Sequence, residues 1–203
     1  MRKALLLTFG LIFSALIQAQ EQNVELREIG SVADAFIALR EATAQNDANG
    51  ISRYSEAVRS YSLDYFLDLT CLDSTEVTPE RNGFADSIIN EIVQKHDRGE
   101  NADGSYRTRT CFIKSGSSNR YELSSKGHQE LAVIAEGGGL ITLKVHVTNR
   151  HGLDVRYDDI KNVKTGLPQR QLSIDLPENT RNIIELEIIN CGTKDCSCVI
   201  ISN

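Results

Sequence analysis

The feature that most constrains the fold is a strict alternation of apolar and polar residues in the C-terminal half of the chain. Every second residue from Ile141 to Val147 is aliphatic, and the residues between them are Thr, Lys or His. Successive side chains of a β-strand point to opposite faces, so this segment predicts a strand with one apolar and one polar face. The pattern recurs at 172–176 and 184–188. Several half-buried antiparallel strands of this kind predict a two-layer β-sandwich.

Turn residues separate the candidate strands at short intervals, which is typical of a sandwich or a jelly roll. The predicted strands are Tyr106–Ile113, Arg120–Leu123, Glu130–Ala135, Leu140–Thr148, Leu153–Tyr157, Gln171–Leu176, Ile183–Asn190 and Cys196–Ile201. Residues 100–104 are rich in Asn, Asp and Gly, which marks a domain boundary there. We therefore assign the sandwich to residues 104–203.

The preceding segment, residues 20–103, has helical periodicity. Ser31 followed by Asp34 predicts a helix start, and this helix should end near 46–50. A second helix is predicted from one stripe of residues at helical spacing: Ile51, Tyr54, Val58, Tyr61, Tyr65 and Leu69. A third should start at Thr78-Pro79-Glu80 and end at 96–99. We expect an α+β fold, in which a helical hairpin or small bundle leans on an antiparallel, jelly-roll-like β-sandwich.

The first 19 residues predict a secretory signal peptide. Arg2 and Lys3 form a short basic head, an apolar run extends to Ile17, and Ala19 precedes a polar segment. The alternative interpretation is an N-terminal membrane anchor, but the apolar run is short for a segment that spans a bilayer. We expect cleavage after Ala19, a mature protein that is periplasmic or secreted, and no membrane insertion after the signal is removed.

The charge balance limits the kinds of partner. The chain has 22 basic and 28 acidic residues and a formal net charge of −6. An acidic chain without a clustered basic stripe argues against binding to nucleic acid or to anionic membrane surfaces. Tryptophan is absent and aromatic residues make up 6% of the chain, which lowers the expectation of a carbohydrate-binding surface.

The five cysteines predict disulfides if the protein is exported. Cys191 and Cys196 flank a four-residue connection that would close a simple hairpin, so we expect them to face one another and form a disulfide. A shift in register would pair Cys191 with Cys198 instead, and zinc bound by Cys191, Cys196, Cys198 and a histidine is the metal-binding alternative. Cys71 and Cys111 are candidates for a second disulfide.

One loop is rich in carboxylates. Asp154, Asp158 and Asp159 follow the turn at 149–152, and a loop of this kind could supply several oxygen ligands to calcium. Arg156 sits among these carboxylates and the spacing differs from that of an EF-hand, so a solvated acidic loop is the alternative interpretation. We expect no cofactor, with calcium at this loop as the alternative.

No catalytic motif is present in the sequence. There is no Gly-x-Ser-x-Gly elbow, no His-Glu-x-x-His, no phosphate loop and no dinucleotide fingerprint. The chain has four histidines, which are His96, His128, His146 and His151. Each could act as a general base only beside a nucleophile or an orienting carboxylate. We therefore expect that the protein is not an enzyme.

Several segments together resemble bacterial pre-peptidase C-terminal domains, which are small secreted β-sandwiches. They are Gly127-His-Gln-Glu-Leu-Ala-Val-Ile-Ala-Glu-Gly, Leu143-Lys-Val-His-Val-Thr-Asn-Arg-His-Gly, Ile184-Glu-Leu-Glu-Ile-Ile-Asn and the final strand ending at Asn203. The resemblance implies an exported protein of unassigned function with a helical segment before the sandwich. It also implies an accessory role, since such domains commonly accompany secreted hydrolases without being the catalyst. Where the family often carries acidic residues and a cation site, this chain has Leu140-Ile-Thr-Leu-Lys144.

These observations predict an exported, non-catalytic binding or accessory module that acts through protein–protein interaction. The contact surface would be a face of the sandwich or the helical stripe, and the partner an envelope or extracellular protein that the sequence leaves unknown. One alternative is a calcium-dependent module that binds a small ligand or glycan through the loops at 149–159. A further alternative is a hydrolase whose residues converge only in three dimensions.

Overall fold

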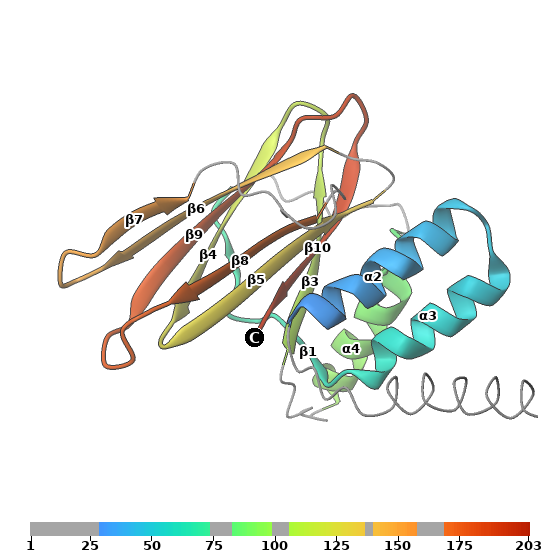
Figure 1. Cartoon of the computed structure of the whole chain (residues 1–203), viewed down its shortest axis with the longest axis horizontal. Helices are drawn as coiled ribbons and strands as arrows, with labels where there is room; N and C mark the ends of the chain where they lie inside the picture. Colours follow the sequence, from blue (N-terminus) through green and yellow to red (C-terminus); the bar gives the residue numbers. More distant parts are fainter. Residues whose placement is uncertain (1–28, 74–82, 99–105, 137–139, 158–168) are drawn as a thin grey trace, which may run out of the picture.

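A computed structural model describes residues 29–73, 83–98, 106–136, 140–157 and 169–203 (Figure 1). The helices are α2 (Ile29–Ala44), α3 (Ala48–Ser60) and α4 (Asp86–Asp97); the strands are β1 (Leu63–Tyr65), β2 (Thr70–Cys71), β3 (Tyr106–Ile113), β4 (Ser118–Ser125), β5 (His128–Ala135), β6 (Ile141–Asn149), β7 (Asp154–Tyr157), β8 (Gln169–Asp175), β9 (Asn182–Asn190) and β10 (Cys196–Ser202). The prediction of an α+β protein with an N-terminal helical part is confirmed. The predicted signal peptide and the helix start at Thr78 lie outside the described residues.

The strands form two five-stranded sheets. The inner sheet has the order β1-β3-β10-β5-β8, and the outer sheet has the order β2-β4-β9-β6-β7. From β3 to β10 the chain passes between the sheets in the order of a jelly roll, as predicted. The described pairs are antiparallel except for β1 with β3, which is parallel. Among the described residues no helix is both long and apolar enough to cross a membrane.

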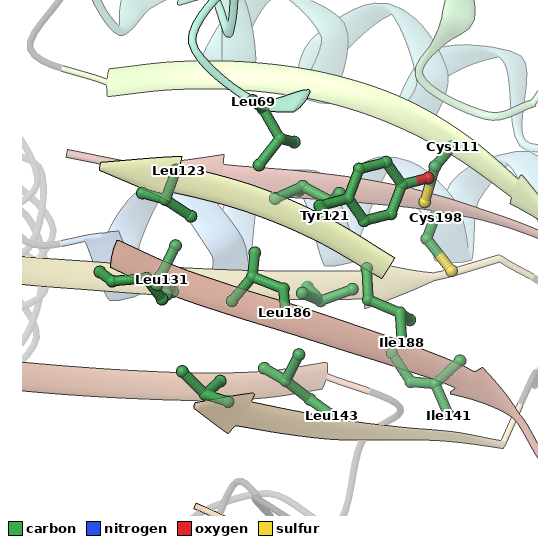
Figure 2. Close-up of a cluster of buried hydrophobic side chains, with 14 of the residues drawn as sticks. Leu69, Cys111, Tyr121, Leu123, Leu131, Ile141, Leu143, Leu186, Ile188 and Cys198 are labelled. Atoms are coloured by element: carbon green, nitrogen blue, oxygen red, sulfur yellow. The ribbon is translucent and has the colours of Figure 1, made fainter. Parts of the chain in front are cut away.

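The first hydrophobic core lies between the two sheets. The aliphatic residues of the alternating segment in β6 are at most 1% exposed, and Leu186 and Ile188 of β9 are fully buried beside them. In Figure 2, Ile141, Leu143, Leu186 and Ile188 lie in one cluster with Tyr121, and with Leu131 and Cys198 of the inner sheet. The alternation in the sequence therefore has the predicted origin, which is one strand face packed in the sandwich.

A second core lies on the other face of the inner sheet. Val32 and Phe36 of α2 and Ile88 of α4 are buried in a cluster with side chains of β5 and β10, which are Ala132, Ile134, Val199 and Ile201. Figure 1 shows the helices gathered against the inner sheet. The inner sheet is thus covered on both faces, and every residue of β10 is buried. The molecule has three layers, in the order helices, inner sheet and outer sheet.

The second helix is shorter than predicted. The stripe from Ile51 to Leu69 was expected to be one helix, but α3 ends at Ser60, and Leu63–Tyr65 is strand β1. This strand pairs in parallel with the start of β3, where Leu63 lies opposite Tyr106. A pairing of two segments distant in sequence leaves no mark in the local periodicity. Thr70–Cys71 is strand β2 and joins the outer sheet, so the segment before residue 104 contributes a strand to each sheet.

The predicted hairpin between the last two strands is wrong. β9 lies in the outer sheet and β10 in the inner sheet, so the connection 191–195 crosses from one sheet to the other. The Asn190 side chain stabilises this crossing, because its Nδ2 donates hydrogen bonds to the carbonyl oxygens of Ile113 and Lys194. A jelly roll joins its sheets through such short crossings, which have the same length as a hairpin turn.

Candidate binding face

The polar residues of the alternating strands share the outward surface of the outer sheet. In register, Arg120 of β4 lies opposite Glu187 of β9, which lies opposite Lys144 of β6. A second row crosses all four longer strands of this sheet: Glu122, Glu185, His146 and Arg156. These residues and Asp154, opposite Thr148 at the end of β7, are exposed or half-buried. We call this set of eight residues the charged face.

The first row of the charged face is held by ion pairs. Lys144 Nζ lies 3.5 Å from Glu187 Oε2. At the other end, Arg120 donates to Asp73 Oδ1 through Nε at 3.2 Å and Nη2 at 3.0 Å, and its backbone N donates to Asp73 Oδ2 at 2.6 Å. These hydrogen bonds lower the pKa of Asp73. Opposite charges alternate along the row, so neither sign dominates it.

His146 links the second row to the edge strand. Its Nε2 lies 2.8 Å from Asp154 Oδ1, and its Nδ1 lies 3.7 Å from Glu185 Oε2. Arg156 Nε lies 3.7 Å from the same Asp154 oxygen. The hydrogen bond with His146 lowers the pKa of Asp154, and the positive charge of Arg156 acts in the same direction. Both ring nitrogens of His146 therefore face carboxylates.

The charged face is hollowed at its centre. A cavity of about 280 Å³ is lined by Arg120, Lys144, His146, Arg156, Glu185 and Glu187, with Val145 and Leu186 below them. A second cavity of about 160 Å³ lies where α3, β1 and α4 meet, and its rim includes Arg59 Nε, which donates to Glu91 Oε2 at 2.8 Å. Both cavities are small and lined by charges of both signs.

The predicted calcium loop is only partly described. Asp154 lies on the charged face, where its carboxylate is engaged by His146 and Arg156. Asp158 and Asp159 lie outside the described residues. Within the described part of the chain, no group of three or more His, Cys, Asp or Glu side chains is placed to hold a metal ion. Calcium binding at this loop stays a prediction.

Cys111, Cys191, Cys196 and Cys198 are free thiols in this structure. Cys191 is exposed at the end of the outer sheet, with its Sγ 3.6 Å from Thr142 Oγ1, whereas Cys196 and Cys198 are buried between the sheets. The hairpin that was to bring Cys191 opposite Cys196 does not exist, and the predicted zinc set is not assembled in the described residues. Cys71 and Cys111 border the same core from opposite sheets, and their disulfide stays a prediction.

The four histidines lie apart from one another. His96 Nδ1 is 3.8 Å from Asp64, His128 Nε2 is 3.4 Å from Glu130, and His151 accepts a hydrogen bond from Arg150 at 3.2 Å. Only His146 belongs to the charged face. Its ring contacts two carboxylates of this face, Asp154 and Glu185, rather than a nucleophile.

Sequence reasoning singled out few of the residues that form the charged face. Arg120, Lys144, Glu185 and Glu187 are the polar members of strands whose apolar members were used to predict the core. The signal was present in the same alternation, since polar residues at every second position must share one face. Only the strand order, which the local pattern does not contain, brings four separate strands side by side.

No family model and no curated protein sequence matches the chain. A mitogen from Yersinia pseudotuberculosis is similar over 48% of this chain and 84% of its own, with 11% identity and a TM-score of 0.37. The periplasmic inhibitor of g-type lysozyme from Aeromonas hydrophila, PliG, is similar over 48% of this chain and 84% of its own, with 12% identity and a TM-score of 0.31. A family 16 carbohydrate-binding module is similar over 44% of this chain and 71% of its own, with 11% identity and a TM-score of 0.31.

Proposed function

We propose that the protein is a non-catalytic binding module whose charged face contacts a partner protein. The observation that carries this proposal is the pair of cross-strand rows of charged residues of both signs on the outward surface of the outer sheet. The helices lie on the inner sheet (Figure 1), and the charged side chains face outward from the outer sheet, which is the opposite layer. A surface of this kind is suited to electrostatic complementarity, which contributes specificity and a fast association rate.

The mixture of charges favours a protein partner over a polyanion. Arg120, Lys144 and Arg156 share the face with four carboxylates, so the face lacks the single positive sign that attracts nucleic acid. Ile183, which is 37% exposed, adds an apolar contact at the end of the same face, and Leu72, which is 40% exposed, lies next to Arg120. Among the described residues the exposed large apolar side chains are aliphatic, whereas stacking on sugar rings needs flat aromatic side chains.

The arrangement around His146 supports a binding role. A general base needs one ring nitrogen directed at the proton that it removes. Both ring nitrogens of His146 face carboxylates, at 2.8 Å from Asp154 and 3.7 Å from Glu185. This imidazole therefore joins β7 to β9 through its two carboxylate neighbours, which orders the surface that a partner would contact.

Charge reversal tests the proposal. We expect the double variant Lys144→Glu, Arg156→Glu to lose at least about tenfold in affinity for a partner captured by the wild-type protein, because like charges across an interface repel. Lys95→Glu on α4 is the matched control, since Lys95 is equally half-exposed but lies on the helical side. The measurement is titration of the purified partner at two salt concentrations. Equal binding by the double variant, or loss of binding in the control, would contradict the proposal.

The export of the protein is a second part of the proposal, and it is supported by the composition of residues 1–19. N-terminal sequencing of the protein from a periplasmic or culture fraction should begin at Gln20. Protein recovered only from the cytoplasm with Met1 intact would refute export. The likeness to pre-peptidase C-terminal domains is likewise a proposal, and it is consistent with an accessory role.

The calcium-dependent alternative is tested separately. Calcium bound at 154–159 would raise the melting temperature, because a ligand that binds only the folded state stabilises it. The rise should disappear in Asp158→Ala. An unchanged melting temperature at millimolar calcium would remove this alternative and leave the charged face unaffected.

A further inference from the structure

Three cysteine thiols meet in the core between the sheets. Cys196 and Cys198 point to the same face of β10, and their Sγ atoms lie 3.8 Å apart. Cys111 of β3 lies opposite Cys198 in the antiparallel register, and the two thiols interact. All three residues are at most 3% exposed. Figure 2 shows the Cys111 and Cys198 side chains inside the sandwich beside Tyr121.

The register makes one of these pairs suited to a disulfide. Directly opposite residues of antiparallel strands have Cα atoms about 4.5–5.5 Å apart, and disulfides join residues whose Cα atoms are about 4.4–6.8 Å apart. Cys111 and Cys198 meet this condition. Residues i and i+2 of one strand are separated by about 6.6 Å and their Cβ atoms point in parallel, so a bond between Cys196 and Cys198 would require the strand to bend. The cross-strand pair is therefore the more stable product.

The three thiols differ in reactivity. A hydrogen bond with the Cys198 thiol lowers the pKa of Cys196 against the opposing effects of burial and of the Glu136 charge, and a hydrogen bond with the backbone of Glu136 and the positive charge of Arg40 add to the lowering. Contact with the Cys111 and Cys196 thiols, together with complete burial, raises the pKa of Cys198. The thiolate is the nucleophile in thiol–disulfide exchange. Cys196 also lies at the first position of β10 and is 3% exposed, whereas Cys198 lies within the strand and is 0% exposed, so we expect Cys196 to react first.

We propose that Cys111 and Cys198 form a disulfide that joins β3 to β10, and that Cys196 receives the oxidising equivalents. The oxidant is a disulfide, of the class of glutathione disulfide or an oxidised dithiol protein. The Cys196 thiolate attacks it and releases one thiolate, which takes up a proton. Cys198, after losing its proton, attacks the Cys196 sulfur and releases the second half of the oxidant as a thiol. Cys111 then loses its proton, attacks Cys198 and returns Cys196 to the thiol. In sum, two protein thiols are oxidised to one disulfide and one oxidant disulfide is reduced to two thiols.

Peptide mapping tests the proposal directly. The reduced, folded full chain, carrying Cys191→Ala to remove the exposed thiol, is incubated with reduced and oxidised glutathione and digested with trypsin after the free thiols are blocked. Cys111 lies in the tryptic peptide 110–114, and Cys196 and Cys198 share the peptide 195–203. We expect these two peptides to be linked, with fragmentation placing the bond at Cys198 and a blocking group on Cys196. The intact protein should lose the mass of two hydrogen atoms.

Single variants separate the two roles. Cys198→Ala and Cys111→Ala should abolish the cross-link, whereas Cys196→Ala should slow its formation several-fold and leave the product unchanged. The mapping of the Cys191→Ala protein stands without these variants, should any of them fail to fold. Any of three outcomes would overturn the proposal. The first is a link from Cys111 to Cys71, and the second is a disulfide confined to the peptide 195–203. The third is that all four thiols can still be blocked after oxidation, even when the protein is refolded in the same buffer.

Discussion

The three-layer arrangement can be tested by truncating neighbouring residues of one strand. Ile200 and Ile201 are adjacent in β10 and both are fully buried, but Ile200 packs in the core between the sheets and Ile201 packs against the helices. We expect Ile201→Ala to destabilise the protein about as strongly as Ile200→Ala. If the helices did not cover the inner sheet, Ile201 would face solvent and its truncation would have little effect.

The magnitude follows from the buried carbon atoms. Replacing Ile by Ala removes three carbon groups, each contributing about 0.8 kcal/mol when buried. The transfer contribution is therefore about 2.4 kcal/mol, and the cavity left behind brings the expected loss to about 2–5 kcal/mol for either residue. Ile183→Ala is the matched control, because Ile183 is 37% exposed on the charged face and its truncation should cost at most about 1.5 kcal/mol.

Urea unfolding followed by circular dichroism measures these losses. With a denaturant slope of about 1–3 kcal/mol per molar urea, both buried truncations should lower the midpoint by about 1 M or more at an unchanged slope. Ile183→Ala should lower the midpoint by clearly less than either buried truncation. A midpoint for Ile201→Ala equal to that of Ile183→Ala would refute the packing of the helices on the inner sheet.

Three further predictions concern individual polar groups. Burial raises the pKa of Glu136, so the folded protein binds this proton more tightly than the unfolded chain does. The free energy of unfolding should therefore fall as pH rises above about 4.5. Glu136→Gln should remove this loss of stability, which thermal unfolding at several pH values would measure. Arg40 is 7% exposed and donates to the Ala135 carbonyl at 3.2 Å, so Arg40→Ala should cost about 1–3 kcal/mol in urea unfolding, and an unchanged midpoint would contradict this contact. Hydrogen bonds from Arg120 lower the pKa of Asp73, so the ionised carboxylate stabilises the folded protein above about pH 4, and this contribution is lost as pH falls through the folded pKa. Asp73→Asn should remove that pH dependence. It should change the urea midpoint at pH 7 only slightly, because the pair is exposed.

The strands were predictable because one face of each packs on a core. The predicted ends of β3 match the structure, both ends of β6 differ by one residue, and for β9 only the start differs, by one residue. Alternation at every second position has no other local explanation. The run Val199-Ile200-Ile201 breaks that alternation. It is the local signal of a strand buried on both faces, and here it reflects the helical layer.

The errors arose where distant segments meet. Tyr61 and Tyr65 stay in phase with the stripe of α3, yet the chain leaves the helix so that Leu63 can pair beside Tyr106. Cys191 and Cys196 have hairpin spacing, yet the strands that they adjoin lie in different sheets. Local spacing is the same for a turn within a sheet and a crossing between sheets, and only the packed core distinguishes the two.

The inner sheet separates the two hydrophobic cores and contributes side chains to both, and this determines where the chain can be truncated. A fragment that starts at residue 104 would keep the jelly-roll strands but would lack the helices that cover the inner sheet. Ala132, Ile134, Val199 and Ile201 would then form a bare apolar strip across β5 and β10. Such a fragment should self-associate. Proteolysis within the helices should unfold the whole protein in one cooperative step and should not release a folded sandwich.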